Sequence, residues 1–306
     1  MNKLRIGIVG YGNIGRGVEK AVNSAPDMEL IGVFTRRDPA ALETLSGAPV
    51  YGVETAASMR DKIDVMMLCG GSATDLAVQG PEFAAMFNTV DSFDTHAKIP
   101  EYLAALDSAA KNTTAVISAG WDPGLFSMLR MLSGAVLPNG RDYTFWGYGV
   151  SQGHSVAIRR IRGVKNAVQY TVPIEKAVEA VRSGSSPELT TGERHVRECY
   201  VVAEEGADRR AIEREIKTMP DYFADNETIV TFISEDKFKS EHAEMPHGGT
   251  VFRSGSTGGK KHVIEFSLKL ESNPEFTGSV LTAYARAAAR LSREGQYGAK
   301  TVLDIP

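Results

Sequence analysis

The sequence predicts an α/β protein in which a doubly wound parallel sheet is followed by a second α+β domain and a C-terminal helix. In the first 120 residues, short apolar runs alternate with helical segments, which is typical of a parallel sheet covered by helices on both faces. After Trp121, strand-like runs follow at irregular spacing with fewer helices between them. Residues 278–294 are rich in Ala, Leu and Arg, which are strong helix formers. We therefore predict a first domain (residues 1–120), a second domain (121–275) and a C-terminal segment (276–306) that packs on the first domain.

The first domain is expected to contain five strands. The helical crossovers between them are expected to be right-handed, as such crossovers almost always are, which gives a doubly wound sheet. Residues 4–9 form an apolar run rich in β-branched side chains, and the helix that follows is predicted at residues 16–24. Further strands are predicted at residues 30–34, 64–69, 89–91 and 115–118, and further helices at 81–87 and 100–111.

The second domain is expected to contain five strands and at least two helices. The strands are predicted at residues 144–149, 169–172, 200–202, 229–233 and 263–270, and the helices at 174–183 and 209–218. Gly, Ser and Thr cluster at residues 254–259, which predicts an exposed hairpin tip.

Composition narrows the classes of partner. The net charge of -4 over 306 residues argues against a nucleic-acid partner, which usually requires a basic stripe. No stretch approaches the roughly 20 apolar residues of a membrane span, so no membrane partner is expected. Cys69 and Cys199 are far apart and form no CxxC pair, so we expect neither a metal site nor a disulfide, and a cytoplasmic protein.

A glycine motif follows the first predicted strand. Gly10, Gly12 and Gly15 fit G-x-G-x-x-G, in which glycines allow a tight turn, close backbone approach to a pyrophosphate, and helix–strand packing. The following helix offers its N-terminal N–H groups to the phosphates. The motif predicts a Rossmann-type dinucleotide site, and the alternative is a tight turn with no ligand. The predicted cofactor residues here are Gly10, Tyr11, Gly12, Asn13, Ile14 and Gly15.

The end of the second strand predicts which dinucleotide binds. An Asp or Glu at this place contacts the ribose of NAD, whereas this chain has Thr35, Arg36 and Arg37. Because arginine binds phosphate bidentately, these residues favour the 2′-phosphate of NADP. The alternative is a solvated basic turn, and Asp38 leaves some use of NAD open. After the third strand, we predict further cofactor contacts, with a plain loop as the alternative, from Cys69, Gly70, Gly71, Ser72, Ala73 and Thr74.

Two aspartates follow the fourth and fifth strands, where ligands bind in such sheets. Asp94 and Asp122 could orient or deprotonate an ammonium group, as oxidation of an amine requires. The alternative for each is an Asx-turn or a helix cap. Aromatic residues around Trp146, followed by Gly, Ser and Gln, could wall a pocket and offer N–H groups to a carboxylate, or could be a strand and a polar turn. His154 is interpreted as structural rather than as an acid or base.

Seven motifs together resemble the meso-diaminopimelate dehydrogenase family. They are GYGNIG (10–15), FTRRD (34–38), LCGGSATD (68–75), DSFDTH (91–96), SAGWDPG (118–124), FWGYGVSQGHS (145–155) and MPHGG (245–249). The resemblance runs from residue 4 to about 306. It implies a homodimer of a Rossmann domain and a dimerisation and substrate domain, acting in lysine biosynthesis. The implied reaction is reversible NADP-dependent oxidative deamination of the D-centre of meso-2,6-diaminopimelate, giving L-2-amino-6-oxopimelate, ammonia and NADPH.

The resemblance also implies roles for individual residues. Asp94 and Asp122 would hold the amino group of the D-centre, and Trp121 and Trp146 would wall the substrate. Within VSQGHS, the implied substrate-binding residues are Ser151, Gln152 and Gly153, the last two near the D-end carboxylate. At the distal end, the implied residues are Thr171, Arg197, His247 and, for the distal amine, Asn273. Without the resemblance, Arg197 would be interpreted as a surface charge and His247 as a turn residue.

The chain departs from the family pattern at Val156, where the family often has Asp or Gly. The family also usually continues beyond a motif like VLDIP, with which this sequence ends. Two alternatives to the implied activity are another NADP-dependent reductase or dehydrogenase of a small amino or oxo acid, and a non-catalytic NADP-binding protein. A reductase would need no aspartate pair for an amine, and a non-catalytic protein would bind NADPH without turnover.

Overall fold

The computed structural model describes residues 3–305, and the chain divides into two compact units. Unit 1 comprises Met1–Met128 and Pro274–Pro306, and unit 2 comprises Leu129–Asn273. Among residues 3–305, no helix combines the length and apolar character needed to cross a membrane. The same residues contain no group of three or more His, Cys, Asp or Glu side chains arranged to hold a metal ion.

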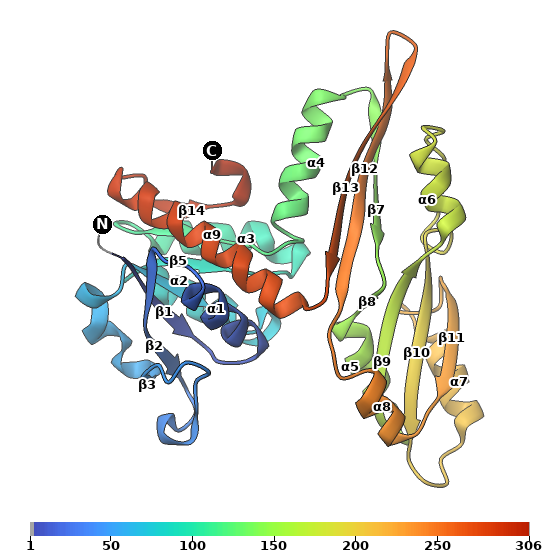
Figure 1. Ribbon diagram of the computed structural model, residues 1–306, viewed down its shortest axis with the longest axis horizontal. Coiled ribbons are helices and arrows are strands. Elements are labelled where there is room, and N and C mark those ends of the chain that lie inside the picture. Colours follow the sequence, from blue (N-terminus) through green and yellow to red (C-terminus); the bar gives the residue numbers. More distant parts are fainter. Residues whose placement is uncertain (1–2, 306) are drawn as a thin grey trace. The chain divides into compact units, whose positions relative to one another are not determined.

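Unit 1 is built on a seven-stranded parallel sheet (Figure 1). Its strands are β1 (Leu4–Val9), β2 (Met28–Thr35), β3 (Val50–Gly52), β4 (Val65–Leu68), β5 (Asn88–Asp91), β6 (Thr114–Val116) and β14 (Gly298–Lys300). Their order is β14-β6-β5-β4-β1-β2-β3, and every pairing is parallel. This order confirms the doubly wound sheet. The chain reverses direction across the sheet between β1 and β4, and ligands of such sheets bind at that point, beyond the carboxyl ends of the strands.

Helices cover both faces of this sheet because successive side chains of a strand point to opposite faces. The helices are α1 (Asn13–Asn23), α2 (Ala77–Ala84), α3 (Ile99–Ala109) and α9 (Asn273–Arg293), with short helices η1 (Pro39–Ala41), η2 (Val53–Lys62), η3 (Ser72–Leu76), η4 (His96–Lys98) and η5 (Val302–Asp304). On one face, Ile6 and Ile8 pack with Leu281 of α9. On the other face, Val9 packs with Phe83 of α2.

The C-terminal helix packs against the first helix at two glycines. A Cβ added to Gly278 of α9 would lie 2.4 Å from the carbonyl carbon of Gly17 in α1. A Cβ added to Gly17 would lie 2.3 Å from the carbonyl oxygen of Pro274. Only glycine permits this approach, so the helices meet backbone to backbone. The predicted return of the C-terminal segment to the first domain is confirmed, and the segment also adds the edge strand β14.

Several helices in unit 1 have other boundaries than predicted, among them α2, which spans Ala77–Ala84 rather than residues 81–87. Helix α1 begins at Asn13 rather than residue 16, so Asn13, Ile14 and Gly15 form its first turn. Residues 72–76 form the π-helical η3 instead of a loop. The Asp75 carboxylate accepts hydrogen bonds from the Gly71 N–H (3.0 Å) and the Thr74 hydroxyl (3.1 Å), which stabilises this helix start.

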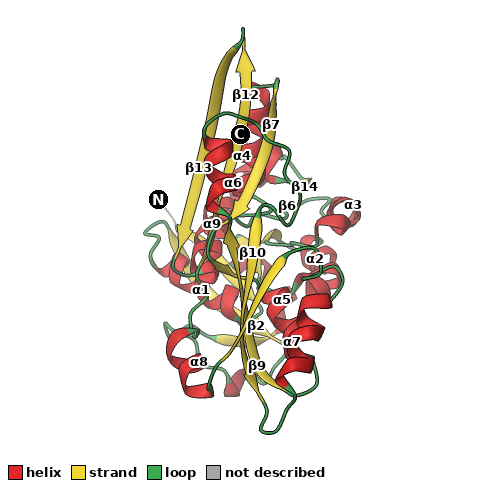
Figure 2. Cartoon of the chain, turned by 90° about the vertical axis from the view of Figure 1, so that its right-hand side faces the viewer, coloured by secondary structure: helices red, strands yellow, loops and turns green. Residues whose placement is uncertain are grey.

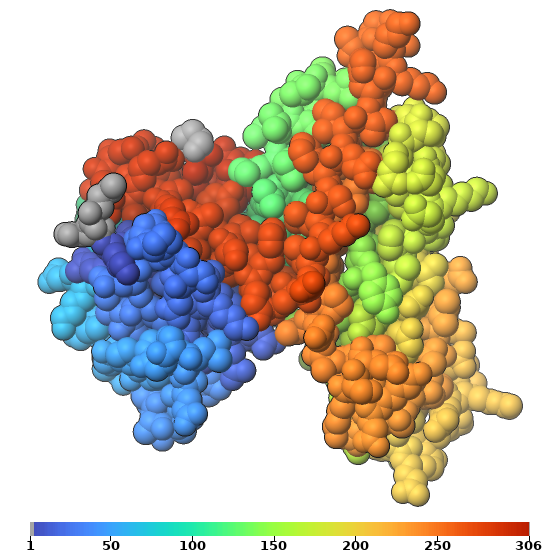
Figure 3. Space-filling view, viewed as in Figure 1, coloured from blue at the N-terminus to red at the C-terminus, as the bar shows by residue number. Residues whose placement is uncertain are grey.

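Unit 2 contains two sheets. One is antiparallel, in the order β13-β12-β7, from β7 (Gly140–Trp146), β12 (His247–Thr257) and β13 (Lys260–Leu270). The other is mixed, in the order β11-β10-β9-β8, from β8 (Gly149–Val150), β9 (Val164–Pro173), β10 (His195–Ala203) and β11 (Glu227–Phe232). Figure 2 shows β7, β12 and β13 side by side as long strands. The predicted hairpin tip is confirmed but shorter, at Gly258 (φ +57°) and Gly259 (φ +78°), and it stands out from its unit in Figure 3.

Five helices accompany these sheets: α4 (Leu125–Val136), α5 (Gln152–Arg159), α6 (Glu175–Arg182), α7 (Arg209–Thr218) and α8 (Glu235–Glu241). The predicted helices α6 and α7 are confirmed. The single strand predicted at 144–149 is wrong, since β7 ends at Trp146 and β8 begins at Gly149. The polar turn considered after it is also wrong, because Gln152 begins α5.

Candidate active site

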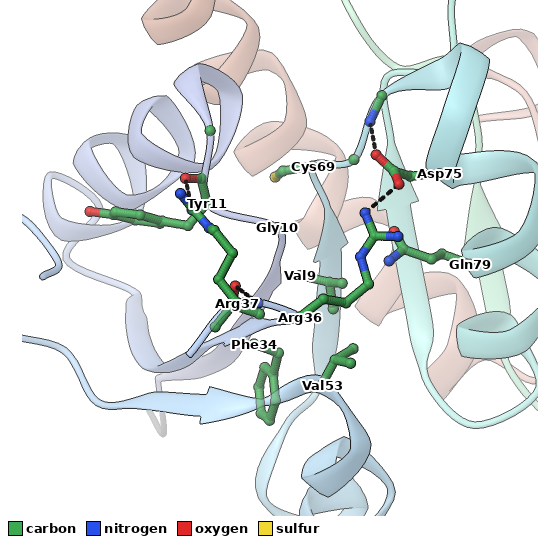
Figure 4. Close-up of a pocket in the computed structure, with 14 residues that line it drawn as sticks. Val9, Gly10, Tyr11, Phe34, Arg36, Arg37, Val53, Cys69, Asp75 and Gln79 are labelled. Atoms are coloured by element: carbon green, nitrogen blue, oxygen red, sulfur yellow. Dashed lines mark hydrogen bonds and ion pairs between the residues drawn. The ribbon is translucent and has the colours of Figure 1, made fainter. Parts of the chain in front are cut away.

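A pocket of about 390 Å³ lies at the carboxyl ends of β1, β2 and β4 (Figure 4). It is lined by Val9, Gly10, Tyr11, Gly12, Phe34, Thr35, Arg36, Arg37, Val53, Cys69, Gly70, Gly71, Asp75 and Gln79. The pocket lies where the strand order reverses between β1 and β4, which is the ligand position expected for a doubly wound sheet. Burial raises the pKa of the Cys69 thiol to about 12, so this side chain acts as a small apolar wall.

The three glycines of the motif have three different environments. Gly10 has φ +86°, a left-handed conformation that favours glycine. A Cβ on Gly12 would meet nothing within 4 Å, so this backbone faces open space at the start of α1. A Cβ on Gly15 would lie 2.3 Å from the Gly10 carbonyl oxygen. These are the tight turn, the phosphate approach and the helix–strand contact of a dinucleotide-binding loop.

The basic residues after β2 line one end of the pocket. The Thr35 side chain is buried, and its hydroxyl oxygen accepts the Arg37 N–H (3.1 Å). The Arg37 guanidinium donates to the Tyr11 carbonyl (2.8 Å), and the Arg36 guanidinium forms an ion pair with Asp75 (2.5 Å). Two guanidinium groups beside an open glycine backbone fit the phosphates of NADP, which these residues would hold when it is bound.

The structure places nine of the predicted cofactor residues in the pocket lining and six outside it. The six are Asn13, Ile14, Gly15, Ser72, Ala73 and Thr74, which lie in the first turns of α1 and η3. Sequence reasoning missed Val9, Phe34, Val53, Asp75 and Gln79. Val9 and Phe34 end strands that the prediction contained, whereas Val53 follows a three-residue strand that gave no signal. The buried Gln79 Oε1 has no hydrogen-bond partner among the described residues.

A buried carboxylate joins the two segments that carry the predicted catalytic aspartates. Asp91, at the end of β5, is 0% exposed. One of its oxygens accepts the N–H groups of Phe93 (2.9 Å) and Ser118 (3.1 Å), and the other accepts the Tyr102 hydroxyl (2.8 Å). The chain leading to Asp94 and the chain leading to Asp122 are therefore fixed to one side chain.

The burial of Asp91 predicts a pH-dependent stability. Burial raises the pKa of this carboxyl from its ordinary 3.8 to about 6, although its three donors partly offset the effect. Because the unfolded state ionises first, the stability contributed by the protonated form is present below pH 4 and is lost as the pH rises to about 6. The free energy of unfolding of wild type minus that of Asp91→Asn should fall by about 2–3 kcal/mol between pH 4 and 7. Urea denaturation at both pH values measures this difference, and an unchanged difference would contradict the ionisation of Asp91.

The predicted substrate residues of unit 1 lie in loops after β5 and β6. The Asp94 N–H donates to the Ser72 hydroxyl oxygen (3.0 Å), which ties the Asp94 loop to the start of η3. Asp122 precedes Pro123 through a cis peptide bond, and Trp121 forms a β-bridge with Gly124. The Trp121 indole is buried edge-on against Phe126, with ring centroids 5.5 Å apart. Asp94 and Asp122 thus lie in loops that follow neighbouring strands of the sheet. Hydrogen bonds to the Asp91 carboxylate hold the beginnings of both loops.

In unit 2, a cluster of polar side chains from the neighbouring strands β9 and β10 is largely buried. Arg197 pairs with Thr171 across these strands, and its guanidinium donates to the Thr171 hydroxyl oxygen (2.5 Å). The Arg197 Nε is buried and has no hydrogen-bond partner in residues 3–305, and burial lowers the pKa of this guanidinium. Gln169 donates to the same hydroxyl oxygen (3.3 Å), and its own Oε1 is buried without a partner. A guanidinium in this setting is suited to binding a carboxylate.

Two further predicted residues lie next to this cluster. The backbone N–H of Trp146 donates to Nε2 of His195 (2.8 Å), a buried histidine on the same face of β10 as Arg197. Burial and the nearby Arg197 lower the pKa of His195 to about 4, so it is neutral and can accept this bond. A Cβ on Gly149 would lie 2.7 Å from Nδ1 of His247, and Gly149 is paired with Thr171. Sequence reasoning missed His195, for which the pattern HVREC gives no signal.

The remaining predicted residues lie at the start of α5 and next to Met245. The Gln152 amide donates to the Met245 sulfur (3.3 Å), and the Asn273 N–H donates to the Met245 carbonyl (3.1 Å). A Cβ on Gly153 would meet nothing within 4 Å. The Ser151 hydroxyl hydrogen-bonds with Nδ1 of His154 (2.8 Å).

His154 and Val156 lie on the same helix, α5, with different exposure. Burial lowers the pKa of His154 to about 4, and its ring lies edge-on against Phe223. This packing accords with the structural interpretation of His154. Val156 is 37% exposed.

Comparisons with known proteins place the chain in a family. Residues 120–272 match the diaminopimelic acid dehydrogenase C-terminal domain. The chain is 64% identical to the meso-diaminopimelate D-dehydrogenase of Lysinibacillus sphaericus, over 100% of this chain and 95% of the relative. The C. glutamicum DAP dehydrogenase in complex with DAP is 48% identical, with a TM-score of 0.92 over 100% of this chain and 95% of that one.

A second solved structure is that of an engineered D-amino acid dehydrogenase bound to NADP⁺. It is 47% identical to this chain, with a TM-score of 0.86, and the match covers 100% of this chain and 95% of that one. These similarities extend over both units and agree with the resemblance found in the sequence motifs. The chain therefore belongs to the meso-diaminopimelate D-dehydrogenase family.

Proposed function

We propose that this protein is an NADP-dependent amino-acid dehydrogenase that oxidatively deaminates the D-centre of meso-2,6-diaminopimelate, reversibly, to L-2-amino-6-oxopimelate and ammonia. The observation that carries this proposal is the identity of 64% with a meso-diaminopimelate D-dehydrogenase along the whole chain. The pocket supports the assignment of NADP as the cofactor, because Arg36 and Arg37 line it beside the open backbone of Gly12. When bound, NADP accepts a hydride at its nicotinamide.

Unit 1 supplies the groups for the reacting amine. Asp94 and Asp122 hold the ammonium of the D-centre, and one of them, or a water molecule beside it, removes the proton that must leave before the Cα–H bond can break. The electron pair of the amine then forms the C=N bond as hydride leaves Cα. Water adds to this imine and ammonia is released. Asp91 acts as a positioning residue, since it fixes the start of both aspartate loops.

Unit 2 supplies the groups that recognise the rest of a dicarboxylic diamine. Arg197, Thr171 and His247 bind the distal carboxylate, and Asn273 contacts the distal amine. Trp146 forms a wall, and Ser151, Gln152 and Gly153 lie near the carboxylate of the D-centre. The unpartnered Nε of Arg197 supports this assignment, because a buried charged donor is costly unless a ligand satisfies it. Trp121, which directly precedes Asp122, forms a wall beside the reacting amine.

The reductive direction tests the amine chemistry. With L-2-amino-6-oxopimelate, NADPH oxidation is expected to require ammonia strictly, because the imine cannot form without it. We expect the rate to rise from the baseline to saturation as ammonium is titrated. Oxidation of NADPH at the same rate without ammonium would contradict the proposal and would identify a reductase of a small oxo acid instead.

The assembly is proposed from the family, and the location and the excluded partners are proposed from the composition as well. We propose a homodimer that acts in the cytoplasm in lysine biosynthesis, with no nucleic-acid or membrane partner. One chain has a mass of 33.0 kDa. Sedimentation of the purified protein at micromolar concentration should give twice this mass. A single species at the mass of one chain would contradict the dimer.

A further inference from the structure

Asp75 and Arg36 form an ion pair that crosses the mouth of the cofactor pocket. Arg36 follows β2 and Asp75 lies in η3 after β4, and these two strands flank β1 on either side. The pair therefore passes over the carboxyl end of β1, where the loop of Gly10 to Gly12 lies. In Figure 4, the Arg36 side chain points across the pocket to Asp75, and both residues line it.

The two partners differ in how firmly they are held. The Asp75 side chain is 17% exposed, and its second oxygen accepts the Gly71 N–H (3.0 Å) and the Thr74 hydroxyl (3.1 Å). The Gly71 N–H is the largest cause that holds the pKa of this carboxyl below its usual value, and Arg36 adds to the effect. The Arg36 side chain is 65% exposed. Asp75 thus keeps two donors if Arg36 turns to another anion, and Arg36 is the more exposed partner.

We propose that Asp75 is a specificity-determining residue that competes with the 2′-phosphate of NADP for the Arg36 guanidinium. The inference rests on the proposed use of NADP. A bound 2′-phosphate needs the same cation that Asp75 holds, and the carboxylate and the phosphate repel each other. NAD carries a hydroxyl group at this position and makes no such demand on Arg36. Asp75 therefore weakens the binding of NADP selectively and reduces the preference of the pocket for NADP over NAD.

Asp75→Asn removes the negative charge and keeps an oxygen for the Gly71 N–H. We expect this variant to bind NADP about two- to five-fold more tightly at low salt, the range set by a partly exposed ion pair, with the affinity for NAD changed less than about two-fold. Isothermal titration calorimetry with each dinucleotide, without substrate, measures both constants. Asp61→Asn is the matched control, because Asp61 precedes β4 at the opposite, amino end of the sheet. It should leave both constants unchanged.

A second variant and a second background keep the test decisive. Asp75→Ser also removes the charge while retaining a hydroxyl oxygen for Gly71, so it serves if the Asn variant does not fold. In an Arg36→Met background, Asp75→Asn should lose most of its gain, because no guanidinium remains to be released. Equal or weaker binding of NADP by the charge-free variants, or an equal gain for NAD, would overturn the role of Asp75. Failure of the wild-type protein to bind NADP at all would instead overturn the proposed cofactor.

Discussion

Replacing Arg197 with Met is expected to lower kcat/KM for meso-2,6-diaminopimelate by about 10²-fold, the equivalent of about 3 kcal/mol for a buried charge pair. The guanidinium is fixed by Thr171 on the neighbouring strand, and its buried Nε has no partner until a ligand supplies one. A D-amino acid with one carboxylate leaves this group unsatisfied. The variant should therefore retain or gain activity on D-alanine, so that the ratio of the two kcat/KM values falls.

Steady-state kinetics with both substrates measure this ratio. Arg141→Met is the matched control, because Arg141 lies near the start of β7, at the other end of that strand from Trp146, and pairs with Glu188. This control should leave the ratio unchanged. If Arg197→Met kept the wild-type selectivity against D-alanine, the assignment of Arg197 to the distal carboxylate would be wrong.

Two alanine substitutions in the glycine motif should separate stability from cofactor binding: Gly15→Ala should lower stability, and Gly12→Ala should lower the affinity for NADP. At Gly15, the new Cβ would meet the Gly10 carbonyl oxygen at 2.3 Å, so Gly15→Ala should cost about 1–3 kcal/mol of stability. At Gly12, the new Cβ meets nothing within 4 Å, so Gly12→Ala should change stability by only about 0.5 kcal/mol. The added methyl group lies where the pyrophosphate approaches, and we expect NADP affinity to fall by about 10- to 100-fold.

Thermal unfolding without ligand and calorimetric titration with NADP separate these two effects. Gly153→Ala is a useful comparison for the first measurement, since its Cβ also meets nothing within 4 Å. Normal NADP affinity in Gly12→Ala would show that the cofactor does not approach this backbone. A stable Gly15→Ala protein would contradict the close contact between α1 and the loop after β1.

The first unit was predictable because its signals are local. Apolar runs marked β1, β2 and β4, and the glycine motif located the turn that follows β1. The edge strand β14 could not be predicted from three residues, because it forms only by pairing with the distant β6. Helix α4 was missed because Met131 and Leu132 are about half exposed, which blurs the contrast between its apolar and polar faces.

The site was only partly predictable from the residues themselves. Arg36 and Arg37 carried a chemical signal next to a recognised strand end. Arg197 became a candidate only through the family resemblance, since its partners Thr171 and Gln169 are brought to it by long-range strand pairing. Asp75 was missed because its role depends on an ion pair between residues 39 positions apart. Contacts of this kind depend on the fold and leave no local pattern.

Formation of NADPH by the purified protein, followed by its absorbance, tests the central claim most directly. With NADP and meso-2,6-diaminopimelate, we expect rapid turnover, and with D-alanine or L-lysine as substrate, or NAD as cofactor, we expect little. Binding of NADPH without turnover of meso-2,6-diaminopimelate would contradict the proposed activity. The pocket at β1 and β4 would then belong to a protein that binds NADP for another purpose.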